Sequence, residues 1–201
     1  MGHDMGHTNP PFDIVAIAAS AGGILALTKV ISELPADFPA RVVVVQHLDP
    51  RHRSLMPQIF ARRSNLPVVQ AAHGMEIEPG HVYLAPPDHH LLISRDDTAT
   101  LTHSELVNFV RPSADLLFES VAAAYGDRAI AVVLTGSGKD GSLGVTAIKS
   151  RGGTVIAQDE ESSEFFSMPA AAIKTGSVDF VLPLDEIPAA LVTLLGGNRP
   201  D

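Results

Sequence analysis

Cysteine and tryptophan are absent from this chain of 201 residues, and aromatic residues make up only 5% of it. Without cysteine, the protein cannot form disulfides, use a thiolate nucleophile or build a cysteine-based zinc site. Apolar runs of the roughly 18 residues needed to span a membrane are also missing. Residues 1–10 lack the apolar segment of a signal peptide. We therefore expect a cytoplasmic protein without membrane insertion.

Positive charge is scarce as well, because 14 Lys and Arg stand against 23 Asp and Glu, for a formal net charge of -9. This balance argues against nucleic acid or an anionic membrane surface as the main partner. The chain is 45% hydrophobic, which suffices for one domain with a real core. We expect a disordered tail over 1–12 and a single folded domain over 13–196.

Strand-like and helix-like segments alternate along most of the chain. Apolar β-branched runs indicate strands at 13–19, 41–46, 66–71, 129–134, 154–158 and 180–182. Apolar residues at helical spacing indicate helices at 22–33, 54–63, 113–125, 141–150, 169–175 and 185–195. Repeated βα units predict an α/β fold, namely a doubly wound, mainly parallel sheet with helices on both faces.

The middle of the chain interrupts this alternation. Three short strand-like runs at 81–85, 90–94 and 99–103 are separated by turn-forming residues at 86–88 and 95–97. Short runs joined by short turns are typical of antiparallel pairing. We interpret the three runs as an antiparallel meander, a hairpin insertion into the parallel pattern.

Ser20 directly follows the first predicted strand, and Gly22 and Gly23 come next. A serine in a tight strand-to-helix turn is exposed beside free N–H groups of the helix. The arrangement is similar to a nucleophile elbow, although Ala18 replaces the glycine expected two residues before the serine. An equally good interpretation from this segment alone is that Ser20 caps the following helix.

His47 and Asp140 stand at the ends of two other apolar strands. A histidine suits a general base because its pKa is close to neutral. Asp140 lies in a glycine-rich loop at 135–141 that can aim a carboxylate. A capping role remains open for each. Because carboxyl ends of parallel strands meet at one edge, Ser20, His47 and Asp140 together suggest the triad of a serine hydrolase.

Nucleotide binding is the competing interpretation of these glycine-rich turns. The G-x-G-x-x-G pattern of dinucleotide sites is absent. The pair Gly138 and Lys139 resembles the end of a phosphate loop, but Val133 stands where its first glycine belongs, and Asp140 replaces the Ser or Thr that would bind magnesium. We therefore predict no cofactor and no metal.

Several longer motifs resemble the catalytic domain of the chemotaxis receptor methylesterases of the CheB type. These are Ala19-Ser20-Ala21-Gly22-Gly23, Gln46-His47, the run 79–86, Arg111-Pro112-Ser113-Ala114-Asp115, the loop 134–141, and 157–160 followed by Met168-Pro169. They occur in the family's order from about Ile14 to Leu195. The resemblance implies a Ser20 nucleophile, a His47 base and an Asp140 orienting acid that remove methyl esters from glutamates of methyl-accepting chemotaxis receptors.

The chain departs from the family pattern in three respects. Ala21 replaces a common threonine, Ser137 replaces a common methionine, and too few residues precede the first strand for the usual receiver domain. We expect a methylesterase catalytic domain standing alone, either excised from a longer protein or as a naturally unregulated, stand-alone form. Backbone N–H groups at Ala21, Gly22, Ser137 and Gly138 are the candidate oxyanion and substrate-binding groups, since a backbone donor survives a change of side chain.

Three hypotheses follow for the function of the chain. The first is an active methylesterase, and the second is deamidation of receptor glutamine by the same triad. The third is a degenerate member that binds a signalling partner without catalysis. The changes at Ala21 and Ser137 motivate the third hypothesis, whereas the intact Ser20, His47 and Asp140 count against it.

Overall fold

The computed structural model describes residues 12–47 and 55–196, and a seven-stranded sheet forms its centre. The strand order is β3-β4-β2-β1-β7-β8-β9, and every neighbouring pair is parallel. The strands are β1 (Ile14–Ala19), β2 (Arg41–Gln46), β3 (Val68–Gln70), β4 (Val82–Leu84), β7 (Ala129–Val133), β8 (Thr154–Gln158) and β9 (Phe180–Leu182). The predicted doubly wound parallel sheet is confirmed.

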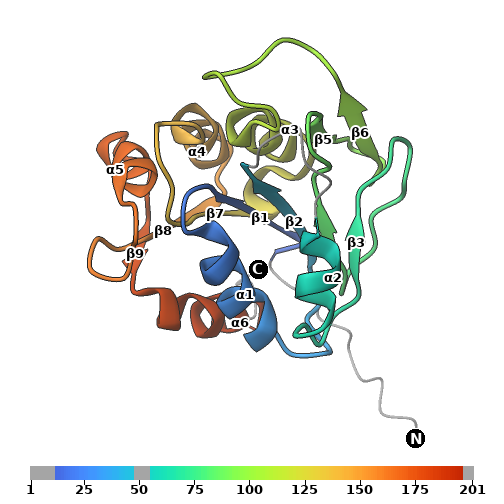
Figure 1. Cartoon of the computed structure of the whole chain (residues 1–201), viewed down its shortest axis with the longest axis horizontal. Coiled ribbons are helices and arrows are strands. Elements are labelled where there is room, and N and C mark those ends of the chain that lie inside the picture. The colour runs from blue at the N-terminus through green and yellow to red at the C-terminus, as the bar shows by residue number, and fades with distance from the viewer. Residues whose placement is uncertain (1–11, 48–54, 197–201) are drawn as a thin grey trace, which may run out of the picture.

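Helices cover both faces of this sheet (Figure 1). One face carries α1 (Gly23–Glu33), α2 (Met56–Ala61) and α6 (Ile187–Gly196), and the other carries α3 (Ala114–Tyr125), α4 (Ser142–Ser150) and α5 (Ser167–Lys174). Each of the six segments predicted as helices contains a helix, with shifts of a few residues at the helix ends. Ser54, predicted to begin the second helix, and residues 1–11 of the predicted tail lie outside the described residues.

Alternation of side chains along the strands builds one apolar core on each face. In β1, Ala16 and Ala18 face the α3 side, whereas Val15 and Ile17 face the α1 side. All six residues of β1 are fully buried, as expected for a central strand covered on both faces. Burial of each large apolar side chain contributes about 1.5–3 kcal/mol, so the central strands are the most firmly held backbone of the domain.

A two-stranded antiparallel sheet packs beside α3 and consists of β5 (His90–Ile93) and β6 (Ala99–Thr102). The predicted hairpin is therefore present, but the predicted three-stranded meander is wrong. Its first run forms β4, which pairs in parallel with β2 and β3 in the main sheet. Val82, Tyr83 and Leu84 are all buried, because β4 is covered on both faces and contributes to both cores.

The order in which strands are added to the sheet switches sides between β1 and β7. After β1 the chain adds β2, β3 and β4 on one side, and it then crosses to add β7, β8 and β9 on the other. Such a switch point leaves a crevice at the carboxyl ends of the strands, where α/β proteins build their sites. Ser20 follows β1, His47 follows β2, and Asp140 lies in the loop after β7. Among the described residues, no helix is long and apolar enough to cross a membrane.

Candidate active site

Ser20 is held at the tip of β1 by its backbone. Its N–H donates to the carbonyl oxygen of Thr135 at 3.0 Å, and its own carbonyl oxygen accepts from Gly23 at 2.8 Å. The N-cap of α1 is Gly22, with a left-handed φ of 75°, and no side chain caps this helix. Ser20 is therefore no helix cap. Its hydroxyl forms no hydrogen bond within residues 12–47 and 55–196, which leaves the oxygen available for chemistry.

His47 and Asp140 form a buried pair. The Nε2 atom of His47 lies 2.8 Å from Oδ2 of Asp140, and the two side chains are only 10% and 3% exposed. An ionised carboxylate can only accept hydrogen bonds, so the Nε2 atom carries the proton. In a neutral imidazole, Nδ1 is then the acceptor. The pair therefore presents a basic nitrogen that is oriented by a carboxylate.

Asp140 does not cap the helix that follows it, because the N-cap of α4 is Gly141 without a side-chain cap. Its carboxylate instead lies at the N-terminus of α3, where it accepts from the N–H groups of Ala114 at 2.6 Å and Asp115 at 3.2 Å. The hydroxyl of Ser113 donates to it at 2.8 Å. Helix N-termini attract anions because their N–H groups lack partners within the helix.

The charge state of Asp140 follows from this surrounding. Burial alone raises the pKa of the carboxyl, but the hydrogen bonds from His47, the Ala114 N–H and the Ser113 hydroxyl outweigh it and hold the pKa of Asp140 below its usual value of 3.8. The carboxylate is thus ionised at neutral pH. Burial raises the pKa of Asp115, whose carboxylate lies close behind and accepts from the Gly144 N–H at 2.8 Å.

Gln46 joins the tips of β1 and β2. Its buried side-chain amide donates to the carbonyl oxygens of Ser20 at 2.8 Å and His47 at 2.9 Å. It therefore fixes the backbone of both residues relative to each other. The amide fits against α1 only because residue 23 is glycine, since a Cβ atom there would lie 2.1 Å from Oε1 of Gln46 and 2.7 Å from Cβ of Ala19.

This close approach predicts that Gly23→Ala destabilises the protein. Alanine normally favours a helix over glycine by about 1 kcal/mol, but overpacking of a tight site costs about 1–3 kcal/mol, and here it displaces Gln46 as well. We expect a lower urea midpoint at unchanged slope. Gly196→Ala is the matched control because a Cβ there has no neighbour within 4 Å; equal loss in both variants would contradict the steric explanation.

The four predicted oxyanion and substrate-binding positions differ in their surroundings. Ala21 and Gly22 line the same pocket as Ser20 and His47. Ser137 is exposed on the loop after β7. The Gly138 N–H is occupied, because it donates to the Ser167 hydroxyl at 3.1 Å. The N–H groups of Ala21, Gly22 and Ser137 have no hydrogen-bond partner in the part of the chain that the structure describes, and these three remain the better candidates.

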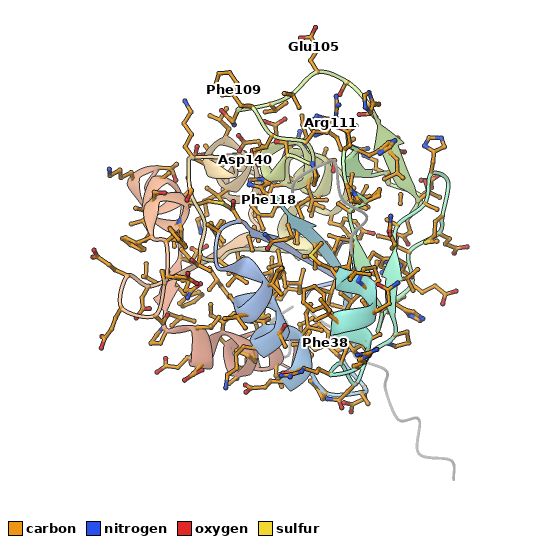
Figure 2. The ribbon with its side chains drawn as sticks, viewed as in Figure 1. Phe38, Glu105, Phe109, Arg111, Phe118 and Asp140 are labelled. Carbon is orange, nitrogen blue, oxygen red and sulfur yellow. The ribbon has the colours of Figure 1, made fainter. Side chains whose placement is uncertain are left out.

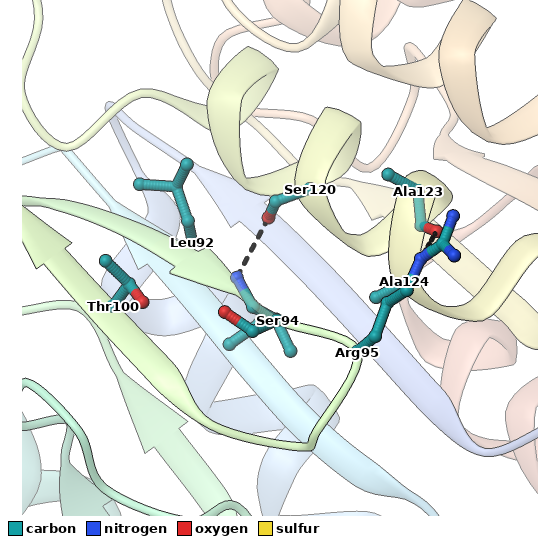
Figure 3. A pocket seen from close by; sticks show the side chains of 8 residues that line it. Leu92, Ser94, Arg95, Thr100, Ser120, Ala123 and Ala124 are labelled. Carbon is teal, nitrogen blue, oxygen red and sulfur yellow. Dashed lines mark hydrogen bonds between the residues drawn. The ribbon is translucent and has the colours of Figure 1, made fainter.

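Ser20 and His47 share an open pocket of about 290 Å³ at the start of α1, lined also by Ile24, Leu25 and Gln46. A second pocket, of about 350 Å³, lies between β5 and the C-terminal half of α3 (Figure 3). Its one charged lining residue is Arg95, whose guanidinium donates to the Ala123 carbonyl oxygen. Because its lining includes no histidine, aspartate or glutamate that could act as a base, this second pocket offers no comparable chemistry. No group of three His, Asp or Glu side chains in the described ranges is placed to bind a metal ion.

Two residues that contact Asp140 were not proposed as site residues from the sequence. Asn108 donates from its amide to Asp115 at 2.9 Å and to Asp140 at 3.4 Å, and Ser113 donates to Asp140 as described above. Both come from the loop and helix start that follow the hairpin. The only available signal was the motif 111–115 itself, whose contact with a loop about 25 residues further on was invisible in the sequence.

Comparisons to known proteins identify the family of this chain. The family model described as CheB methylesterase matches residues 15–191. This chain belongs to the CheB methylesterase family. A "putative protein-glutamate methylesterase/protein-glutamine glutaminase" of Leptospira interrogans is 39% identical, over 93% of this chain and 97% of its own length.

Other relatives in the family are longer. Proteins named protein-glutamate methylesterase/protein-glutamine glutaminase from Thermotoga maritima and Moorella thermoacetica are each 41% identical, but the match covers only 54% and 45% of their lengths. The chain thus spans about half of these relatives. The crystal structure of the Thermotoga maritima CheB methylesterase catalytic domain superimposes with a TM-score of 0.88 at 41% identity, covering 91% of this chain and 98% of that domain.

Proposed function

We propose that this protein hydrolyses the γ-methyl esters of glutamate side chains in chemotaxis receptors and releases methanol. The observation that carries the proposal is the buried pair of His47 and Asp140, whose histidine lines the same pocket as Ser20. Family membership supports the reaction class, since the relatives carry the name protein-glutamate methylesterase.

In the proposed mechanism, Nδ1 of His47 takes the proton of the Ser20 hydroxyl while the Ser20 oxygen attacks the ester carbonyl. The Nε2–H of His47 stays on Asp140, whose negative charge stabilises the imidazolium that forms. The imidazolium then protonates the methoxide, the C–O bond breaks, and methanol leaves. Water, deprotonated by His47 in turn, hydrolyses the acyl-enzyme and restores Ser20.

Stabilisation of the oxyanion falls to backbone N–H groups in this proposal. Ala21 follows the nucleophile at the start of α1, and Ser137 lies in the loop after β7. Loss of one such donor typically costs about 3–4 kcal/mol in the barrier. Because the groups belong to the backbone, the alanine and serine side chains at these positions leave the donors in place.

Deamidation of receptor glutamine is a second activity of the same site. The relatives' names include protein-glutamine glutaminase, and an amide passes through the same tetrahedral intermediate with ammonia as the leaving group. Amides are poorer acyl donors than esters, so we expect this reaction to be slower.

The proposal is tested by incubating the protein with methylated receptor and measuring methanol, and with unmodified receptor and measuring ammonia. We expect methanol release from the first and slower ammonia release from the second. Treatment with a fluorophosphonate, followed by peptide mass spectrometry, is expected to find the adduct on Ser20. A protein that gives neither product and no adduct would instead be a non-catalytic binding module.

A further inference from the structure

Large apolar side chains are exposed around the pocket of Ser20 and His47. Among the described residues, we define six of them as the apolar rim, all in loops or helix starts at the carboxyl end of the sheet: Ile24, Leu25, Leu106, Phe109, Leu143 and Phe165. Leu55, at the start of α2, is exposed at the same end. Exposed apolar side chains that gather around a polar pocket mark a surface for a partner.

Four members of the rim are tied to the candidate site. Ile24 and Leu25 line the pocket itself. Leu143 lies in the first turn of α4, three residues after Asp140. The carbonyl oxygen of Phe165 accepts from the Gly136 N–H at 2.8 Å, beside Ser20. The rim is therefore continuous with the pocket and does not form a separate patch.

Phe109 is the most exposed member, at 94%, and it projects outward from the loop above Asp140 (Figure 2). Val107 and Val110 pair as an isolated antiparallel bridge, so Asn108 and Phe109 form the two-residue turn between them. Their φ angles are 50° and 65°. Turns with two positive φ angles strongly prefer Asn-Gly. Asparagine fits the first position, but phenylalanine at the second is strained.

The strained turn is anchored on both sides, and on one of them to the candidate site. The Asn108 amide donates to Asp115 and Asp140. The Arg111 guanidinium binds the Asp88 carboxylate and the carbonyl oxygen of Ser104. These contacts hold the turn in place while the Phe109 ring itself gains nothing from the fold. A costly residue that contributes no packing to its own domain indicates a contact outside it.

We propose that the apolar rim binds the protein substrate around the modified glutamate, with Phe109 as its outermost contact. The inference rests on the proposed function. A glutamyl side chain is short, so an ester carbonyl that reaches Ser20 brings the receptor backbone to the rim. The partner is thus a receptor segment that places apolar side chains beside the esterified glutamate.

Phe109→Asn tests this docking surface. Asparagine tolerates a positive φ, so the variant removes the ring and relieves the turn. We expect KM for methylated receptor to rise about tenfold while kcat changes less than twofold. The rate of Ser20 labelling by a fluorophosphonate, which needs no docking, is expected to stay within twofold of the parent. The urea midpoint is expected to stay level or increase.

Phe180→Asn is the matched control, because Phe180 is 45% exposed on the edge strand β9 and we expect its KM to be unchanged. If KM is unchanged in Phe109→Asn and the parent protein releases methanol, the docking proposal is overturned and the proposed function is upheld. A rise in KM that is matched by an equal fall in the rate of Ser20 labelling would also overturn the docking proposal, since it would indicate that Phe109 acts through Asp140. Absence of methanol release by the parent protein would overturn both.

Discussion

Ser20→Ala is expected to lower the rate of methanol release from methylated receptor by about six orders of magnitude, the loss found when the nucleophile of a serine protease is removed. The variant keeps the pocket and the backbone donors but has no oxygen to form the acyl-enzyme. Residual hydrolysis above the rate in water is expected, because binding and oxyanion stabilisation survive without the nucleophile.

The fold is expected to tolerate this substitution. The Ser20 hydroxyl has no hydrogen-bond partner within the described ranges, so its removal leaves no buried group unpaired. Unfolding by urea is therefore expected to coincide with that of the parent protein. Ser150→Ala, on the exposed end of α4, serves as the control and should keep full activity. Substantial methanol release by Ser20→Ala would refute the assignment of the nucleophile.

Asp140→Asn is expected to lower kcat by about 10⁴-fold, as the corresponding change does in serine proteases. The asparagine amide would donate to Nε2 of His47, which forces the proton onto Nδ1 and removes the base. The loss should appear in kcat, because the pocket walls are unchanged. Asp37→Asn, at an exposed aspartate without a side-chain hydrogen bond in the described chain, is the control.

Stability should fall in Asp140→Asn as well, and its pH dependence has a definite sign. The folded-state pKa of Asp140 is lowered, so the ionised carboxylate stabilises the folded protein above its usual pKa of about 3.9. That contribution is lost as the pH falls through the lowered folded-state value. The difference in unfolding free energy between parent and variant should thus be full at neutral pH and vanish in strong acid. A constant difference across this range would contradict the role of the charge.

The positions of Ser20, His47 and Asp140 could be predicted because they depend on a local pattern. Each follows a continuous apolar run, and such runs in a parallel sheet end at one edge. Capping, the alternative left open for Ser20 and Asp140, could be decided only by the structure, since it depends on which N–H groups each oxygen meets. Asp140 meets those of α3, a helix that precedes it by about 25 residues.

The sequence contained a pattern that indicates β4 as a strand of the parallel sheet, but the short turns around it led to its assignment to the antiparallel meander. Val82, Tyr83 and Leu84 are consecutive apolar residues, a pattern typical of a strand covered on both faces, whereas the hairpin strand β6 alternates apolar and polar residues. Only one of the two central residues of the turn at 107–110 indicated a turn in the sequence, because asparagine tolerates a positive φ and phenylalanine does not. Its placement beside Asp140 arises from long-range hydrogen bonds that no local pattern encodes.

The order of the strands has a consequence for how the site endures thermal fluctuation. The three candidate catalytic residues are carried by β2, β1 and β7, which lie side by side with two further strands outside them on each flank. Local opening proceeds from weakly packed edges such as β3 and β9, whereas fully buried strands open only with the whole domain. Fraying at the margins therefore leaves in register the three strands whose ends hold the candidate nucleophile, base and acid.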